Sequence, residues 1–123
     1  AVEAARAIAG SASGDAIVAQ IPAGSDRGAL LAAMDVLRQA HSGSAVLLIS
    51  ADDEGGKVSI AAQVPEALIA RGLRAGDWVR EASNACGGKG GGKPDKAQGG
   101  GTDPARAGDA EAAARAFAAQ SLG

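Results

Sequence analysis

The stretch that decides the fold is AVLLISADDEGGKVSIAAQV, residues 45–64. Residues 45–50 form a continuous apolar run that ends in a serine. This pattern is typical of a strand covered on both faces, so we expect it to be the central strand of a sheet. The cluster DDEGG at 52–56 is rich in turn-forming residues, and beyond it apolar residues alternate with polar or small ones from 57 to 64. The sequence therefore predicts a β-hairpin whose second strand is the more exposed one.

Upstream of this hairpin the sequence predicts a further strand and a helix. AIVAQI at 16–21 is short, apolar and partly β-branched, and Pro22 ends it. Ser25 or Asp26 can cap a helix that Gly43 closes. Because its apolar positions recur at helical spacing, we expect this helix to be amphipathic; these positions are Leu30, Met34, Leu37 and His41.

Downstream of the hairpin there are signals for three helices. A short helix is expected over 65–72, and a second helix begins near Asp77. Trp78 falls on the apolar stripe of that second helix, so we expect it to pack in the core rather than to stack on nucleic-acid bases. The last helix starts at Pro104 and presents a small-residue face with Phe117 as its anchor.

Taken together, these elements predict the fold class. Their order is strand, helix, strand, strand, helix, helix, glycine-rich loop and helix. Since the hairpin excludes a purely parallel sheet, we expect an α/β fold with a mixed β-sheet flanked by helices. At 123 residues the chain has room for one domain. We expect residues 1–14 to be the end of a preceding helical region and residues 15–123 to form a single globular domain.

Several kinds of site are excluded by composition. The single cysteine, Cys86, cannot form an intrachain disulfide, and with the single histidine, His41, it cannot complete a four-ligand zinc shell. We expect no metal and no cofactor in this domain, and a small buried side chain at Cys86. The longest strongly apolar run, residues 45–49, is far shorter than the roughly 18 residues that a membrane span needs. We therefore expect no membrane partner and a location inside the cell.

Charge is distributed unevenly along the chain. The formal net charge is −2 at pH 7. Between Arg71 and Lys96, however, six cations face three anions, so this segment carries +3 and the remainder −5. A basic segment on an acidic domain is expected of a local anion-binding patch. Chance clustering of solvated charges is the alternative interpretation.

The basic segment contains the glycine-rich stretch GGKGGGKPDKAQGGG, residues 87–101. Consecutive glycines can present backbone N–H groups to an anion, and lysines among them supply positive charge. A flexible linker is the alternative, but Pro94 and the helix signal that follows argue against it. The stretch is not an ATP-binding P-loop, because Pro94 stands where Ser or Thr should follow Lys93. We expect a phosphate-binding loop.

This stretch resembles the signature GGxGGGRPDxAQxGG of the C-terminal, DHH-associated domain of alanyl-tRNA synthetases, a domain group shared with DHH-type phosphoesterases. The preceding segment, residues 63–83, is similar to the corresponding segment of those synthetases. Phosphoesterase relatives usually have a histidine after the triple glycine, where this chain has Lys93. The resemblance thus favours the synthetase branch, although Lys93 replaces the usual arginine and Lys96 replaces a common methionine.

The resemblance implies a non-catalytic domain that contacts the outer corner of tRNA and supports aminoacylation and editing by a parent enzyme. The parent enzyme would use ATP, Mg and Zn, none of them in this domain. Implied partners are tRNA, other single-stranded nucleic acid, the parent's aminoacylation and editing domains, and a second copy in a homodimer. The implied location is the cytoplasm or an organelle. The candidate nucleic-acid-binding residues are Lys89, Gly90, Gly91, Gly92, Lys93, Lys96, Gln98, Gly99, Arg71 and Arg74.

Two other functions remain open at the level of sequence. The chain is also compatible with a phosphate-binding or nucleic-acid-binding accessory domain of a DHH-type phosphoesterase. A dimerisation module is the third hypothesis, because the alanine-rich last helix permits close approach of a second chain.

Overall fold

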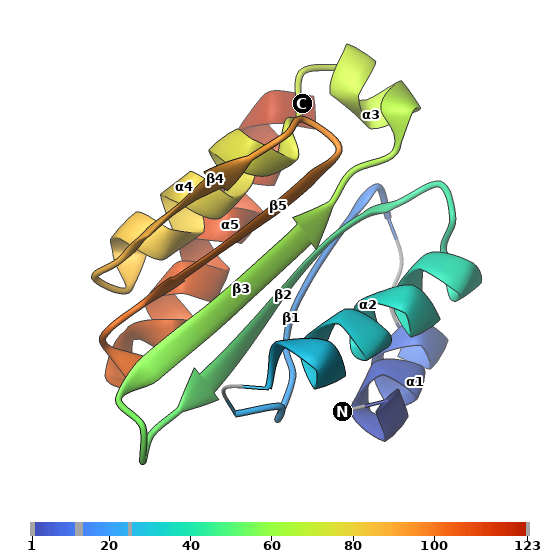
Figure 1. The fold of residues 1–123 in the computed structure, drawn as a ribbon. Helices are drawn as coiled ribbons and strands as arrows, with labels where there is room; N and C mark the ends of the chain where they lie inside the picture. The colour runs from blue at the N-terminus through green and yellow to red at the C-terminus, as the bar shows by residue number, and fades with distance from the viewer. Residues whose placement is uncertain (1, 12–13, 25, 123) are drawn as a thin grey trace.

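A five-stranded mixed β-sheet between two helical layers forms the domain, as the computed structural model shows for residues 2–11, 14–24 and 26–122 (Figure 1). The strands follow the order β1-β2-β3-β5-β4 across the sheet. Only the β1–β2 pair is parallel, and the other three pairs are antiparallel. The predicted α/β class with a mixed sheet is confirmed. The strands are β1 (Ala16–Gln20), β2 (Ala45–Asp52), β3 (Lys57–Gln63), β4 (Lys89–Gly92) and β5 (Lys96–Gly101).

The helices lie on both faces of this sheet (Figure 1). Helices α1 and α2 cover one face, and α4 and α5 cover the other. The short helix α3 and a 3-10 turn lie in the connections between these elements. The helices are α1 (Val2–Ser11), α2 (Arg27–Ala40), α3 (Glu66–Ala70), α4 (Ala75–Ala85) and α5 (Ala107–Leu122), and the 3-10 turn η1 is Pro104–Arg106.

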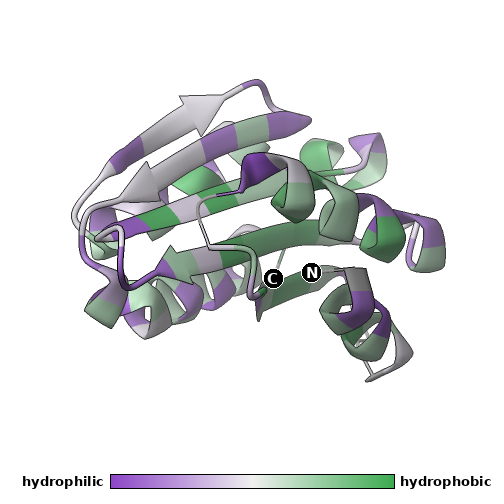
Figure 2. Ribbon diagram, turned by 60° about the horizontal axis from the view of Figure 1, so that its bottom comes forward, coloured by the Kyte–Doolittle hydropathy of each residue, from purple (hydrophilic) through white to green (hydrophobic). Residues whose placement is uncertain are grey.

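Strand β2 contributes to two separate hydrophobic cores. Leu47 and Ile49 pack toward α4 and α5, whereas Val46 and Leu48 pack toward α1 and α2. Successive side chains of a strand point to opposite faces, so a continuous apolar run fills both cores. Figure 2 shows the hydrophobic colour on the inner strands and a pale or hydrophilic colour on the β4–β5 hairpin. The sequence prediction of a strand covered on both faces is confirmed.

The middle strand of the sheet is β3, not β2 as the sequence predicted. The sequence predicts β3 to be the more exposed strand of its hairpin, but residues 58–62 are buried throughout. The burial comes from helices that pack on both faces of β3, and its central position comes from a further strand at its second edge. The glycine-rich stretch 87–101, expected to be a loop, forms the hairpin of β4 and β5, and β5 pairs with the second edge of β3.

Close packing against α4 explains why glycine occupies so much of this hairpin. Gly90 and Gly99 are cross-strand partners on the face toward α4. A Cβ atom added at Gly99 would lie 2.6 Å from the Ser83 hydroxyl oxygen and 2.7 Å from a methyl carbon of Val79. The same two side chains would meet a Cβ atom at Gly90, at 2.6 Å each. Helix α4 thus rests on bare backbone, which only glycine allows.

Helix α2 begins as its sequence predicts and ends earlier. The Asp26 side chain accepts a 3.0 Å hydrogen bond from the Ala29 amide at the N-cap. The other predicted cap, Ser25, lies outside the described residues. At the C-terminus, His41 rather than Gly43 closes the helix, and its Nε2 lies 2.7 Å from the Ala9 carbonyl oxygen. His41 thereby links α2 to α1 and has a structural role.

Helix α1 packs on α2 and supplies a buried residue to the same core. This residue is Ala5, whose side chain has no exposed surface. The segment expected to be the end of a preceding helical region, residues 1–14, therefore includes a helix that packs on the domain.

Trp78, rather than the predicted Phe117, anchors the interface between α4 and α5. Its indole is fully buried, and its Nε1 donates a 2.8 Å hydrogen bond to the Ala114 carbonyl. Phe117 is only partly buried at the edge of the core. Small residues of α5 face the tryptophan side of the core, namely Ala107, Ala110, Ala114 and Ala118. A buried Trp uses its N–H when a partner is within reach, and the small α5 face brings the helix backbone close enough.

Candidate nucleic-acid interface

The β4–β5 hairpin presents its candidate residues on two opposite faces. Gly90, Gly92 and Gly99 share a face with the buried Ala97, and the Cβ positions of Gly90 and Gly99 lie against Val79 and Ser83 of α4, whereas Gly92 is exposed at the end of β4. The other face carries Lys89, Gly91, Lys96 and Gln98, all of them exposed. We call these four residues the open hairpin face. The structure therefore separates the candidate residues into a packing set and an exposed set.

The exposed set is extended at the tip of the hairpin. Lys93 lies in the turn between β4 and β5 and is exposed. The N-terminus of α4 touches this turn, because the Ala75 amide donates to the Pro94 carbonyl at 2.8 Å and the Gly76 amide donates to the Lys93 carbonyl at 3.2 Å. Arg74, the N-cap residue of α4, therefore stands beside the turn. One edge of the molecule collects the cations Lys89, Lys93, Lys96 and Arg74.

Within the part of the chain that the structure describes, these four cations form no ion pair. Within the described residues, the four ion pairs of the structure join Arg71 to Asp15, Arg80 to Asp77, Arg106 to Asp109 and Arg115 to Glu111. The lysines of the hairpin and Arg74 appear in none of them. Their charge is thus available to a ligand in solution.

Arg71 does not join the hairpin cluster. Its Nη1 contacts an Asp15 carboxylate oxygen at 2.9 Å, and its Nη2 donates to the Leu122 carbonyl at 2.9 Å. Both partners lie at the side of the sheet that carries β1 and α5. The structure therefore does not place Arg71 with the other candidate residues.

The glycines of β5 do not form the predicted phosphate cradle. Strand β5 lies between β3 and β4, so its backbone is paired on both sides. N–H groups engaged in a sheet cannot converge on an anion as they do in a nest. Strand β4 is the edge strand, so the hairpin offers a phosphate group its lysine side chains and the outer backbone of β4.

Sequence reasoning missed one cation beside the open hairpin face. Arg27, the first residue of α2, donates from Nη1 to the Gln98 side-chain oxygen at 3.0 Å and from Nη2 to the Gly99 carbonyl at 3.2 Å. These partners are more than 70 residues apart in the chain. The sequence holds no signal of this long-range contact.

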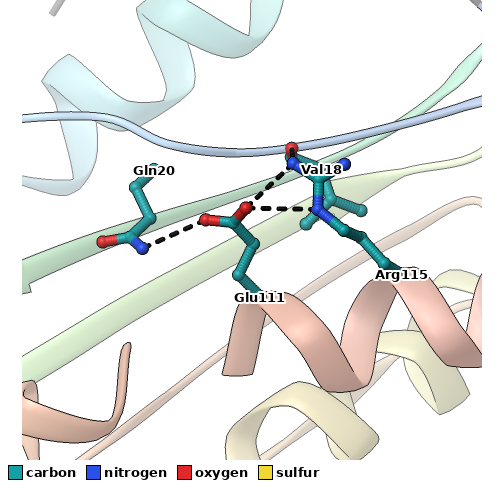
Figure 3. A network of polar contacts seen from close by, with 4 residues as sticks. All are labelled: Val18, Gln20, Glu111 and Arg115. Atoms are coloured by element: carbon teal, nitrogen blue, oxygen red, sulfur yellow. Dashed lines mark hydrogen bonds and ion pairs between the residues drawn. The ribbon is translucent and has the colours of Figure 1, made fainter. Parts of the chain in front are cut away.

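The opposite edge of the sheet uses its charges internally (Figure 3). Glu111 on α5 accepts hydrogen bonds from Gln20 at 3.0 Å and from Arg115 at 2.8 and 3.1 Å. Arg115 also donates to the Val18 carbonyl at 2.8 Å. Burial acts to raise the pKa of Glu111, but the hydrogen bonds from Gln20 and Arg115 and the charge of Arg115 outweigh it, so the pKa is lowered from its ordinary 4.5. This edge is neutralised, unlike the hairpin edge.

Cys86 is a core residue, as the sequence predicted. Its side chain has no exposed surface, and the Ala82 and Ser83 carbonyls lie 3.6 and 3.5 Å from its sulfur. Burial raises the pKa of the Cys86 thiol. A thiol that is buried and protonated is a poor nucleophile.

In the described part of the chain no three His, Cys, Asp or Glu side chains group as metal ligands, and no helix is both long and apolar enough to cross a membrane.

Comparisons with known proteins agree with this architecture. The DHHA1 domain family matches residues 13–120. The alanine–tRNA ligase of Geobacillus kaustophilus is 44% identical over 69% of this chain, and that of Pseudomonas entomophila is 46% identical over 80%. The chain spans only 9% and 11% of the length of these two ligases.

A solved structure shows the same fold. The crystal structure of the C-Ala domain from Aquifex aeolicus alanyl-tRNA synthetase aligns with a TM-score of 0.65 and 25% identity, covering 88% of this chain and 89% of that one. The residues that the DHHA1 family matches, 13–120, include the five strands, α2, α4 and most of α5. This chain belongs to the DHHA1 domain family and corresponds to the C-terminal region of alanine–tRNA ligases.

Proposed function

We propose that this domain binds the sugar-phosphate backbone of tRNA at its outer corner, as the C-terminal appendage of an alanine–tRNA ligase. The observation that carries the proposal is the group of exposed cations at the hairpin edge, Lys89, Lys93, Lys96 and Arg74, which take part in none of the ion pairs of the described residues. The similarity to alanine–tRNA ligases supplies the nature of the polyanion.

Recognition by this edge relies on charge and shape. Lysine ammonium groups act as point charges toward phosphates and impose no planar geometry. The open hairpin face carries no aromatic side chain on which a base could stack, and Trp78 is buried in the core. Backbone and shape contacts are how proteins recognise folded RNA without reading its bases. The domain itself catalyses nothing in this proposal.

The role of the domain is then to hold one tRNA molecule for the parent ligase. The aminoacylation and editing domains of that enzyme are the implied partners, and its ATP, Mg and Zn chemistry takes place there. Such an appendage works wherever the tRNA is charged, in the cytoplasm or in an organelle with its own translation.

Titration with fluorescently labelled tRNA at several salt concentrations tests the proposal. The wild-type chain should bind with a log–log salt slope of roughly −2 to −3 if three lysines each neutralise one phosphate. The variant K89A/K93A/K96A should lose most of this affinity and this slope. Single-stranded DNA is the competitor, and tRNA should be preferred.

A control variant with the same change in net charge separates a localised site from general attraction. R6A/R80A/R106A removes three exposed arginines that lie outside the hairpin. This control should bind tRNA nearly as well as the wild type. Equal losses in both triple variants, or an affinity that does not depend on salt, would contradict the proposal.

A further inference from the structure

A shallow depression lies between the start of α2 and the hairpin. Its volume is about 490 Å³, and three elements of the sheet and one helix contribute to its wall. The side chains around it are Arg27, Lys57, Ser59, Lys89 and Thr102, and its floor is the glycine backbone of residues 99–101. Of these residues, only Lys89 and Gly99 belong to the candidate set that the sequence singled out.

The depression is positively charged, and no carboxylate is among the described residues that line it. Arg27, Lys57 and Lys89 come from α2, β3 and β4, and none of the three forms an ion pair within the described residues. Asp52, which faces Lys57 across the β2–β3 ladder, accepts a 2.9 Å hydrogen bond from the Gly55 amide in the turn. Three other open cavities each include acidic side chains in their lining: Asp15 in one, Glu66 and Asp95 in the second, Asp35 in the third.

One of the three cations is already oriented. Two N–H groups of Arg27 are held by the Gln98 side chain and by the Gly99 carbonyl. A guanidinium has five N–H donors, so this anchoring leaves three for a ligand. Because the anchor is part of β5, the guanidinium stays beside the depression without a ligand, which lowers the entropy cost of binding.

The glycine floor admits a ligand close to the backbone. Of the three floor glycines, Gly100 shares the face of Lys89 and carries no side chain there, whereas a Cβ atom at Gly99 or Gly101 would point toward α4. The hydroxyl group of Ser59 lies in the wall, whereas the Thr102 hydroxyl already donates to the Gly87 carbonyl at 3.0 Å. A cluster of three cations and one hydroxyl over bare backbone matches a phosphate group, which takes charge-assisted hydrogen bonds through several oxygens.

We propose that this depression is a seat for a single phosphate group, held by Arg27, Lys57 and Lys89, and that the RNA backbone supplies that phosphate. The seat is separate from Lys93 and Lys96 at the tip of the hairpin. The phosphate source rests on the proposed function, whereas the anion seat itself rests only on the geometry of the depression.

The first experiment measures tRNA affinity and its salt slope in K57A and R27Q. Each variant should weaken tRNA binding by about three- to tenfold and reduce the magnitude of the salt slope by about one. The control is R6A, which removes an exposed arginine from α1 and should leave affinity and slope unchanged. Far-ultraviolet circular dichroism verifies that each variant is folded. Wild-type affinity in both K57A and R27Q would overturn the seat and leave the role of the hairpin lysines intact.

The second experiment does not depend on tRNA binding. Amide resonances of Ser59 and residues 99–101 are followed by NMR during titration with inorganic phosphate and, separately, with tRNA. Both probes should shift these resonances in the wild type and not in the double variant R27Q/K57A. If neither inorganic phosphate nor tRNA shifts these resonances, the seat is overturned. Shifts with phosphate alone overturn the RNA source, and if tRNA also fails to bind, they show that the proposed function fails while the anion seat stands.

Discussion

The two edges of the sheet are protected in different ways. At the β1 edge, charged side chains of α5 reach over the strand, and Arg115 donates to the Val18 carbonyl. At the β4 edge, no side chain is available from the glycines, and α4 instead packs directly on one face of the hairpin backbone. The Arg115 contact limits the pairing of β1 with another chain, whereas α4 stabilises the β4–β5 hairpin from its face.

The way in which each edge is stabilised determines whether its charged side chains are available to a ligand. At the β1 edge the charges of Glu111 and Arg115 are neutralised, because the two side chains form an ion pair with each other. The hairpin edge is held by packing on its inner face, so its lysines remain free on its outer face. Glycine allows α4 to pack closely on the inner face of the hairpin, and the lysines on the outer face stay exposed to solvent.

Replacing a glycine that contacts α4 should have the largest effect. In Gly99→Ala the new methyl group would meet Ser83 and the backbone of Gly90 at 2.6 and 2.7 Å, so α4 must move away. We expect a loss of about 3 kcal/mol in the free energy of unfolding, at the upper end of overpacking effects. Urea unfolding measures this loss.

The matched control for this variant is Gly91→Ala. Gly91 lies in the same hairpin on the open face, and no atom lies within 4 Å of an added Cβ atom. We expect its stability to stay within about 0.5 kcal/mol of the wild type. Equal losses in the two variants would mean that glycine acts through backbone conformation and not through contact with α4.

Removing the cap of the opposite edge should have a smaller effect. In Arg115→Ala the Val18 carbonyl and the Glu111 carboxylate lose a donor. We expect a loss of about 1 kcal/mol, because Arg115 is largely exposed and screened by water. The uncovered β1 edge should also increase self-association in sedimentation velocity.

Arg106→Ala serves as the control for the edge cap. Arg106 also pairs with a carboxylate one helical turn away but contacts no strand carbonyl. If this variant self-associates as much as Arg115→Ala, the association reflects lost charge and not the exposed strand.

The smallest expected effect is a dependence of stability on pH. Since the pKa of Glu111 is lowered in the folded state, its contribution is fully present above about pH 4.5 and is lost as the pH falls through the folded value. The stability difference between wild type and Glu111→Gln should therefore shrink in acid. Chemical denaturation between pH 3 and pH 7 measures it. Glu54→Gln, in the exposed β2–β3 turn, is the control, and an equal pH dependence there would refute the role of the network in Figure 3.

The parts of the fold that the sequence predicted correctly are those whose signal is local. The β2–β3 hairpin carries its own apolar alternation and turn residues, and the cap of α2 at Asp26 lies beside the residues that it caps. The hairpin of residues 89–101 has no such signal, because alternation cannot be seen without side chains. Its strand character depends on pairing with β3, which is distant in the sequence, and on packing against α4, which the sequence pattern of the hairpin does not indicate.

The candidate site shows the same limit. Lys89, Lys93 and Lys96 were identifiable because they lie within the glycine-rich stretch, where they add positive charge beside the backbone N–H groups. Arg71 and Arg74 are three residues apart, yet one is paired with Asp15 and the other stands at the hairpin tip. The chain turns between α3 and α4, and this turn sends the two arginines to different sides of the molecule. The direction of the turn is visible only in the tertiary structure.

The buried Trp78 gives the two sides of the sheet different optical properties. It is the only tryptophan, and the chain contains no tyrosine, so ultraviolet fluorescence arises almost entirely from the layer of α4 and α5. The layer of α1 and α2 contributes to circular dichroism but not to this emission. Since β2 fills both cores, the two signals should follow one unfolding transition. Two separate transitions would mean that the sheet does not couple its two helical layers.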